Sequence, residues 1–333
     1  MTYELIHANA IEWLTNNRSK YENYFHAVIT DPPYGLKEYK PEELEKRANG
    51  SGGIWRIPPK IGGSERSPLP RFTVLEDKDI EELYNFLFQT AKALFPVLRP
   101  GGHIFIATNS ILEHIVSNAF IQNGFEKRAI IVRLVQTLRG GDRPKNAESE
   151  FPEVCVMPRS AWEPWVLFRK PLEGRVSDNL RKWETGGLRR ISMDVPFMDV
   201  IPSERTSKQE REIAPHPSLK PQSFLRQLIW AALPLGKGVI LDPFAGSGST
   251  LAAATALNVR SLGIEVNSEY YEMAKKAIPQ LALVKITLPV GSVTTSRNGR
   301  KKDGIAKCNT TTSSQSSIFD TPIELKSKQA HDK

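Results

Sequence analysis

The chain has 333 residues, of which 40% are hydrophobic, and a formal net charge of +8 at pH 7. This length and composition favour one large α/β core with a smaller attachment, and the basic charge suits a polyanionic partner. No apolar run approaches the roughly 18 residues of a membrane span, and the polar first residues are not typical of a signal peptide. We therefore expect a cytoplasmic protein without membrane contact.

The first 34 residues predict a strand, a helix and a second strand that ends at the sequence Asp-Pro-Pro-Tyr. The predicted strands cover residues 3–6 and 26–30, and the helix covers residues 10–14. Ligands of an open α/β sheet sit beyond the carboxyl ends of its strands, so we expect the residues after the second strand to face a pocket. These candidate catalytic residues are Asp31, Pro32, Pro33 and Tyr34.

These residue types suit a flat ligand that carries an exocyclic amine. Asp31 is a hydrogen-bond acceptor, and the prolines lack an N–H, which leaves the Pro32 carbonyl available as a second acceptor. Tyr34 can stack on an aromatic ring, an interaction worth roughly 1–3 kcal/mol per base. The alternative is a strand-ending turn in which Asp31 only caps the next segment.

A basic segment rich in Gly and Pro, residues 46–71, follows this motif. It predicts a mobile loop that closes over a bound base, with a surface loop of no function as the alternative. Lys37 and Arg56 are candidate DNA contacts in this part of the chain. The pattern then predicts a helix over residues 80–98, a strand over 102–107, a helix over 111–123 and a strand over 130–135.

Residues 136–150 predict a second basic loop. Its Arg139, Arg143 and Lys145 could hold backbone phosphates, and a solvated turn is the alternative. Residues 151–157 and 165–168 then predict the two strands of a hairpin, which would place Cys155 in a strand core. Because Cys155 and Cys308 lie far apart and fit neither a metal nor a redox spacing, no metal site is predicted.

Residues 238–250 carry the second motif, an apolar strand that runs into a Gly-rich turn and an Ala-rich helix. No Lys precedes its Ser and Thr, as a Walker loop requires, and the third Gly of the dinucleotide fingerprint is missing. The next strand, residues 261–265, ends in Glu265, where a carboxylate can hold ribose hydroxyls. An adenosyl ligand is favoured over a structural turn. The candidate cofactor-binding residues are Asp242, Phe244, Ala245, Gly246, Ser247, Gly248 and Glu265.

The two motifs, Asp-Pro-Pro-Tyr at 31–34 and Asp-Pro-Phe-Ala-Gly-Ser-Gly-Ser-Thr at 242–250, in this order resemble the S-adenosylmethionine-dependent DNA amino-methyltransferases of the permuted β class. Residues 216–221, His-Pro-Ser-Leu-Lys-Pro, are similar to the segment that precedes the cofactor loop in that family. Residues 98–106 are similar to its strand after the catalytic one. The similarity covers residues 3–285, except that residues 175–215 show none and Ser249 replaces a common Thr.

The resemblance implies a Rossmann-like α/β methyltransferase fold, with a mostly parallel sheet flanked by helices. Its parts would be a catalytic half over 1–171, a target-recognition region over 172–215, a cofactor-binding half over 216–285 and a disordered tail over 286–333. It implies S-adenosylmethionine as cofactor, double-stranded DNA as partner, a cognate restriction endonuclease as a further partner, and a monomer or homodimer.

The resemblance also implies roles for single residues. Ser218, Lys220 and Asp242 would orient the amino-acid end of the cofactor, and Phe244 would pack near the sulfonium or the base. The arginines of the target-recognition region would contact base edges in the major groove, unless surface salt bridges hold them. They are Arg181, Arg189 and Arg190.

The expected reaction is methylation of adenine N6, because Asp in the first position of the 31–34 motif is commoner among adenine enzymes of that family. Cytosine N4 is the alternative. An RNA or protein amino-methyltransferase is more remote, since those proteins place the cofactor loop first. A dehydrogenase would need the missing third Gly. A non-catalytic nucleic-acid binding module would have no need of the pocket acid Asp31.

Overall fold

A computed structural model describes residues 2–33, 77–135, 141, 143–144 and 146–286, together with the backbone of residues 60–61 and 64–65. All of the fully described residues fall within one compact unit. Several predicted features lie outside the described residues. They are Tyr34, Lys37, Arg56, Arg139, Lys145, Cys308, nearly all of the 46–71 loop and the tail from residue 287.

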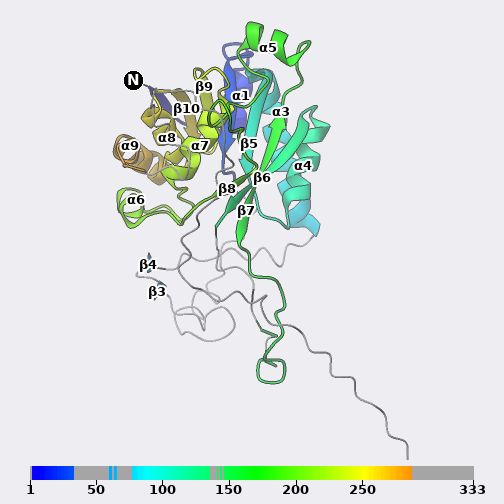
Figure 1. Ribbon diagram of the computed structural model, residues 1–333, viewed down its shortest axis with the longest axis vertical. Helices are drawn as coiled ribbons and strands as arrows, with labels where there is room; N and C mark the ends of the chain where they lie inside the picture. The colour runs from blue at the N-terminus through cyan, green and yellow to red at the C-terminus, as the bar shows by residue number, and fades with distance from the viewer. Residues whose placement is uncertain are drawn as a thin grey trace, which may run out of the picture. The chain divides into compact units, whose positions relative to one another are not determined.

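An eight-stranded sheet forms the centre of the molecule, with the strand order β1-β10-β9-β2-β5-β7-β6-β8 (Figure 1). The strands from β1 to β5 in this order are parallel, β7 is antiparallel to both of its neighbours, and β8 is parallel to β6. β3 (Lys60–Ile61) and β4 (Ser64–Glu65) form a separate antiparallel pair. The bounds are β1 Tyr3–His7, β2 Phe25–Thr30, β5 Leu98–Ala107, β6 Glu126–Leu134, β7 Trp162–Arg169, β8 Val200–Pro202, β9 Val239–Asp242 and β10 Arg260–Glu265.

Helices cover both faces of this sheet. One apolar cluster joins α1, α3 and α4 to the sheet, and other clusters join α7, α8 and α9 to it, so the two sets lie on opposite faces. The predicted fold class, a mostly parallel sheet flanked by helices, is therefore confirmed. The helices are α1 Ala10–Asn16, α3 Asp77–Val97, α4 Glu113–Gln122, α5 Val176–Trp183, α6 Lys208–Ile213, α7 Gln222–Ala232, α8 Ser249–Ala256 and α9 Ser268–Ala282.

The two-residue period of a strand explains why both faces are apolar. In β2, Val28 packs on the α1, α3 and α4 side, whereas Ala27 and Ile29 pack on the α7 side. Ile104 and Phe105 divide in the same way in β5. Because helices cover both faces, these strands are continuous apolar runs, which is the pattern that made them predictable.

Most predicted elements have a counterpart in the structure, but the strand predicted at residues 151–157 is wrong. This segment forms no strand, Val156 is 64% exposed, and Cys155 is an exposed free thiol. β7 pairs instead with β6, along a ladder that runs from Glu126 to Leu134. Pro152 removes a backbone donor from the mispredicted segment and Pro158 removes another directly after it, which explains why its apolar side chains do not lead to pairing.

The region predicted for target recognition is partly integrated into this fold. β8 adds to the main sheet beside β6, with Val200 paired to Val132. The side chain of Ile201 is buried in the apolar cluster on the α7 side. Among the described helices, none is long and apolar enough to cross a membrane.

Candidate active site

Three acidic residues lie at the carboxyl ends of adjacent strands. Asp31 directly follows β2, Asp242 ends β9 and Glu265 ends β10. β10, β9 and β2 are neighbours and parallel, with Asp242 opposite Gly263 and Leu241 opposite Val28. The fold therefore brings the two sequence motifs to one edge of the sheet, where open α/β sheets bind their ligands.

Asp242 ties the two motifs together. Its Oδ1 accepts hydrogen bonds from the Thr30 hydroxyl at 2.7 Å and from the Phe244 amide at 3.2 Å. Thr250 in α8 donates a further hydrogen bond to this carboxyl. Burial raises the pKa of Asp242 to about 6, although these hydrogen bonds act against the rise. Asp242 thus holds the end of β2 beside the turn that follows β9.

The Gly-rich turn is held by Glu265. Its Oε2 accepts the Gly246 amide at 2.7 Å, and its Oε1 accepts the Asn267 amide at 2.8 Å. Each carboxylate oxygen keeps a further acceptor site, so this arrangement fits a ligand with ribose hydroxyls. Gly246 has a positive φ of +51°, and a Cβ there would approach the His216 ring at 3.3 Å.

The other residues of the turn pack inward. The Phe244 ring lies 5.5 Å from the Phe86 ring of α3, centroid to centroid. Ala245 and Ser247 are buried, and the Ala245 amide donates to the Ile264 carbonyl at 2.9 Å. The turn is therefore built into the core on one side.

The segment before α7 lies against this turn. The His216 ring makes an edge contact with the Tyr270 ring at 4.3 Å, and its Nδ1 accepts the Ser218 amide at 3.2 Å. Burial, with the nearby charge of Lys220, lowers the pKa of His216 to about 4, so the ring is neutral at pH 7. Ser218 is exposed.

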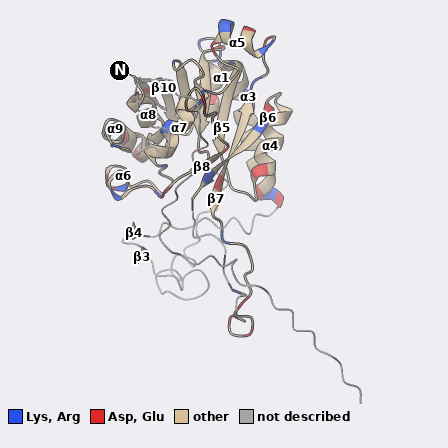
Figure 2. Ribbon diagram, viewed as in Figure 1, with Lys and Arg blue, Asp and Glu red and all other residues tan. Residues whose placement is uncertain are grey.

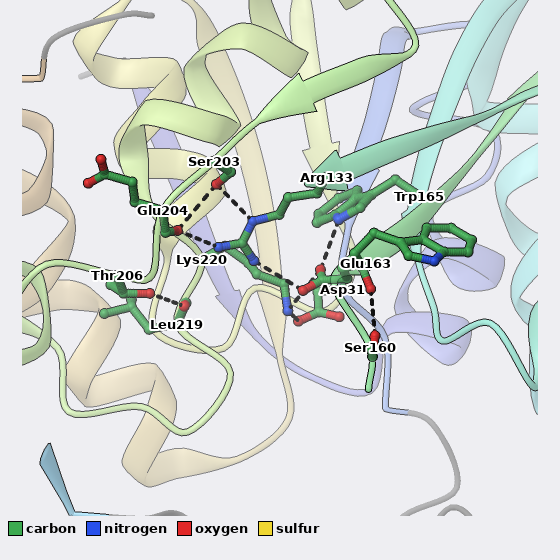
Figure 3. A network of polar contacts seen from close by, with 11 residues as sticks. Asp31, Arg133, Ser160, Glu163, Trp165, Ser203, Glu204, Thr206, Leu219 and Lys220 are labelled. Carbon is green, nitrogen blue, oxygen red and sulfur yellow. Dashed lines mark hydrogen bonds and ion pairs between the residues drawn. The ribbon is translucent and has the colours of Figure 1, made fainter. Parts of the chain in front are cut away.

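Lys220 connects this segment to the first motif (Figure 3). Its Nζ lies 2.5 Å from Oδ2 of Asp31 and 3.5 Å from Oε1 of Glu163. Burial lowers the pKa of Lys220, but the two carboxylates outweigh burial and the pKa is raised overall, so the amine is charged. The cofactor-orienting role expected for Lys220 stays a prediction. The contact that the structure shows is with the candidate catalytic carboxylate.

Glu163 and Arg133 belong to this site but were not predicted. Arg133 in β6 and Glu163 in β7 are register partners, and Nη1 of Arg133 lies 3.0 Å from Oε2 of Glu163. Arg133 could have been found, because an arginine inside the apolar run 130–135 is rarely buried without a partner. Glu163 carries no such signal in the sequence.

The predicted DNA-contacting arginines lie elsewhere. Arg181 in α5 is exposed and pairs with Asp178, and α5 packs where β5 begins, since Asn179 donates to the Pro100 carbonyl at 2.9 Å. In Figure 2 the ribbon of α5, at the top of the view, is coloured for both basic and acidic residues. α5 is at the amino end of the sheet, away from Asp31, and Arg181 has the surface salt bridge that was the alternative to base contact, while its role toward DNA stays a prediction.

Arg189 and Arg190 are also distant from Asp31. The Arg189 guanidinium stacks over the Trp230 ring at 3.5 Å, near the end of α7, and the Arg190 carbonyl accepts the Trp230 indole N–H at 3.0 Å. α7 ends shortly before β9 begins, so this contact also lies at the amino end of the sheet. Arg189 contacts a ring and Arg190 donates to the Ser192 and Met193 carbonyls, and their predicted contacts with base edges stay a prediction. Arg143 is exposed in the connection between β6 and β7.

Comparison with solved structures identifies the fold. The M1.HpyAVI–SAM complex matches with a TM-score of 0.53 at 18% identity, over 83% of this chain and 98% of that chain. The cytosine-N4-specific PvuII DNA methyltransferase matches with a TM-score of 0.56 at 14% identity, over 87% and 89%. The predicted Rossmann-like methyltransferase fold is thereby confirmed.

Sequence comparison identifies the family. The type II methyltransferase M2.DpnII of Streptococcus pneumoniae is 39% identical over 82% of this chain and 88% of its own length. The DNA adenine methyltransferase YhdJ of Escherichia coli is 43% identical over 63 residues, which are 19% of this chain and 21% of YhdJ. The DNA methylase family model matches residues 25–276. The chain belongs to this family of S-adenosylmethionine-dependent N6 and N4 DNA amino-methyltransferases.

Proposed function

We propose that this chain transfers a methyl group to the exocyclic N6 of an adenine that is flipped out of duplex DNA. The observation that carries the proposal is the placement of Asp31. Its carboxylate lies at the same sheet edge as the Gly-rich turn, and the Thr30–Asp242 hydrogen bond fixes the two against each other. A base inside a duplex cannot reach this edge, so the nucleotide must leave the stack at a cost of a few kcal/mol.

The chain's own groups prepare the amine. Its nitrogen is a weak nucleophile because the lone pair is conjugated with the ring. Hydrogen bonds from its two N–H groups to Asp31 and to the Pro32 carbonyl favour the pyramidal nitrogen and stabilise the positive charge that develops there. Tyr34 stacks on the base. The methylated nitrogen then releases one proton, so Asp31 need not be a strong base.

The second motif holds the methyl donor. S-adenosylmethionine supplies a methyl group made electrophilic by its sulfonium. Glu265 binds the ribose hydroxyls through the free acceptor sites of its carboxylate, and the backbone of residues 246–248 lies against the ligand. Ser218 and Lys220 are close to the amino-acid end. Asp242 acts indirectly, because its contacts within the protein hold the turn.

Adenine is preferred over cytosine for two reasons. The first residue of the 31–34 motif is Asp, and the YhdJ relative is by name an adenine enzyme. The acceptor geometry alone suits either amine, and the PvuII enzyme shares the fold while acting on cytosine N4. Residue identity, and not the fold, therefore carries this preference.

Nucleoside mass spectrometry of plasmid DNA treated with the protein and S-adenosylmethionine tests the proposal. We expect N6-methyladenine, and N4-methylcytosine in its place would overturn the choice of base. Sequencing of the modified positions would then give the recognition site. Arg143, which is exposed in the connection between β6 and β7, is a candidate for holding a phosphate of the duplex.

The catalytic role of Asp31 is tested by the Asp31→Ala variant. Removal of the acceptor should lower the methyl-transfer rate by about 100-fold or more, because charge stabilisation at the reacting atom is lost. Equilibrium binding of S-adenosylmethionine serves as the control and should persist. A variant that methylates DNA at the wild-type rate would sink this role.

A further inference from the structure

Glu163 and Arg133 extend the Lys220–Asp31 pair into a row of alternating charges (Figure 3). The row starts at Asp31, passes through Lys220 and Glu163, and ends at Arg133. The four side chains are between 6% and 20% exposed. Two positive and two negative charges balance, so the row is neutral as a whole.

Arg133 anchors the row. Its Nε donates to the Ser203 hydroxyl at 3.0 Å and its Nη2 donates to the Glu204 carbonyl at 3.0 Å, while its guanidinium packs over the Phe224 ring. Glu163 is held on its other side by the Trp165 indole N–H, which donates to Oε1 at 2.9 Å. Both side chains are therefore fixed by several contacts from different elements.

Lys220 needs such an anchor. An ammonium group on a four-carbon stem makes a point contact and can move, whereas a guanidinium is held by its planar fork. Glu163 supplies a second carboxylate that competes with Asp31 for the ammonium. The position of Lys220, and through it the position and effective charge of Asp31, thus depends on Glu163.

Fold stability gives a weaker explanation of the row. Buried ion pairs are frequently no more stabilising than apolar residues of the same volume, because desolvation opposes the attraction. Burial alone raises the pKa of Glu163, and Lys220 together with Arg133 is needed to outweigh it. Such an arrangement is expected where the charge itself has a use.

We propose that Glu163 and Arg133 are positioning residues for methyl transfer, which act by holding the Lys220 ammonium between Glu163 and Asp31. This inference rests on the proposed function of Asp31. With Glu163 in place, Lys220 divides its charge between two carboxylates, and Asp31 stays a strong acceptor in a fixed orientation. Without Glu163, the ammonium turns wholly to Asp31 and weakens it as an acceptor for the amine.

The β6–β7 ladder contains its own control pair. Arg133 and Glu163 are register partners at the carboxyl end of β6, and Glu126 and Arg169 are register partners at its amino end. Nη2 of Arg169 lies 2.6 Å from Oε2 of Glu126, so this pair is also a cross-strand bridge. It bridges the same two strands, at the end away from Lys220.

The decisive measurement is the single-turnover methyl-transfer rate of Glu163→Gln beside that of Glu126→Gln. We expect Glu163→Gln to lower the rate by about 10- to 100-fold, the range that loss of precise positioning produces. Binding of S-adenosylmethionine should be unchanged, and Glu126→Gln should leave the rate at the wild-type level. Equal rates for the two variants would overturn the proposal.

Two double-variant measurements test the path through Lys220. Glu163→Gln should slow a Lys220→Met enzyme no further, and additive losses would contradict the proposal. In the protein without ligand, the shifts in urea midpoint caused by Asp31→Asn and Glu163→Gln should not be additive, because both residues contact Lys220. Independent shifts would likewise contradict it.

A second substitution covers the case in which Glu163→Gln does not fold. Glu163→Asp keeps the negative charge but shortens the side chain by one methylene, which draws the carboxylate away from Lys220, so a loss of rate is expected and a wild-type rate would reject the inference. The proposed function fails separately. If the wild-type protein transfers no methyl group to DNA, the function is wrong, whereas an active wild type with a fully active Glu163→Gln variant rejects only the positioning role.

Discussion

Asp242 shows how one buried carboxyl serves two motifs that lie about 200 residues apart in the chain. The carboxyl is 3% exposed and accepts hydrogen bonds from both sides. Those bonds favour its charged form, but burial outweighs them and raises the pKa of Asp242 to about 6. The ionised carboxylate thus lowers the free energy of unfolding near neutral pH, although its hydrogen bonds hold the two motifs together.

The stability of the Asp242→Asn variant, measured as its difference from the wild type, should be more favourable at pH 8 than at pH 5. A carboxyl with a pKa near 6 when folded and 3.8 when unfolded takes up protons preferentially in the folded state, so the contribution of Asp242 to wild-type stability rises as pH falls through 6. The amide stays neutral and keeps the Oδ1 acceptor. Its advantage should be larger at pH 8 than at pH 5 by about 1.5 kcal/mol, measured by urea unfolding.

The exposed Asp199 in front of β8 provides the matched substitution, Asp199→Asn, for loss of an aspartate in general. The comparison removes effects of net charge that depend on pH. If Asp242→Asn changes the free energy of unfolding by the same amount at both pH values, burial does not raise the pKa of Asp242. Its hydrogen bonds alone would then determine its contribution to stability.

At the scale of elements, the turn between β9 and α8 depends on glycine. Gly248 precedes α8 with φ of +81°, and a Cβ on it would collide with Ile278 of α9. Both the backbone conformation and the packing therefore exclude a side chain. α9 packs against the turn at Gly248 and fixes it, which explains how a loop can present its backbone to a ligand without moving.

Replacement of this glycine should damage stability and cofactor binding together. Gly248→Ala is expected to lower the free energy of unfolding by about 2–4 kcal/mol through strain and overpacking, and to weaken binding of S-adenosylmethionine. Gly187→Ala is the matched control, since a Cβ there meets no atom within 4 Å. Urea unfolding and isothermal titration measure the two effects. Equal behaviour of the two variants would refute the packing argument.

Elements with a clear period were predictable, and contacts between distant residues were not. The local sequence shows the apolar runs of β2 and β9 and the acid that ends β10. Asp31, Asp242 and Glu265 could therefore be predicted as site residues. The partner of Lys220 is 189 residues away, and the Arg133–Glu163 pair depends on which strand lies next to β7. The false strand at 151–157 has a different cause, because its prolines disfavour pairing and are visible in the sequence.

At the scale of the whole molecule, β2 has a charged cluster at each end. Asp31 and Lys220 form one at its carboxyl end. At its amino end, Nε2 of His26 lies 3.6 Å from Oε2 of Glu184, which also pairs with Arg99 and Lys237. The His26 cluster joins segments around the starts of β2, β5 and β9. The contacts of the His26 cluster connect strands at the amino edge of the sheet, and the proposed catalytic residues lie at its carboxyl edge.

The amino edge makes the fold sensitive to acid. Nδ1 of His26 accepts the Val239 amide at 3.0 Å, a bond that requires the unprotonated nitrogen. Burial, with the charge of Arg99, lowers the pKa of His26 to about 4, and burial lowers the pKa of His103 to about 3. Between pH 6.5 and pH 4 these two histidines therefore bind more protons in the unfolded chain than in the folded one, and their contribution to stability falls as pH falls.

From pH 6.5 to pH 4.5 each of these two histidines should lower the free energy of unfolding by up to about 1.4 kcal/mol per pH unit, a loss that protonation of Asp242 partly offsets. His26→Asn keeps an acceptor for the Val239 amide but does not titrate in this range, so its slope should be shallower by one such contribution. His114→Asn, at an exposed position of α4, is the control. A slope identical in His26→Asn and the wild type would mean that His26 is already protonated in the fold, and that the bond to Val239 is made differently.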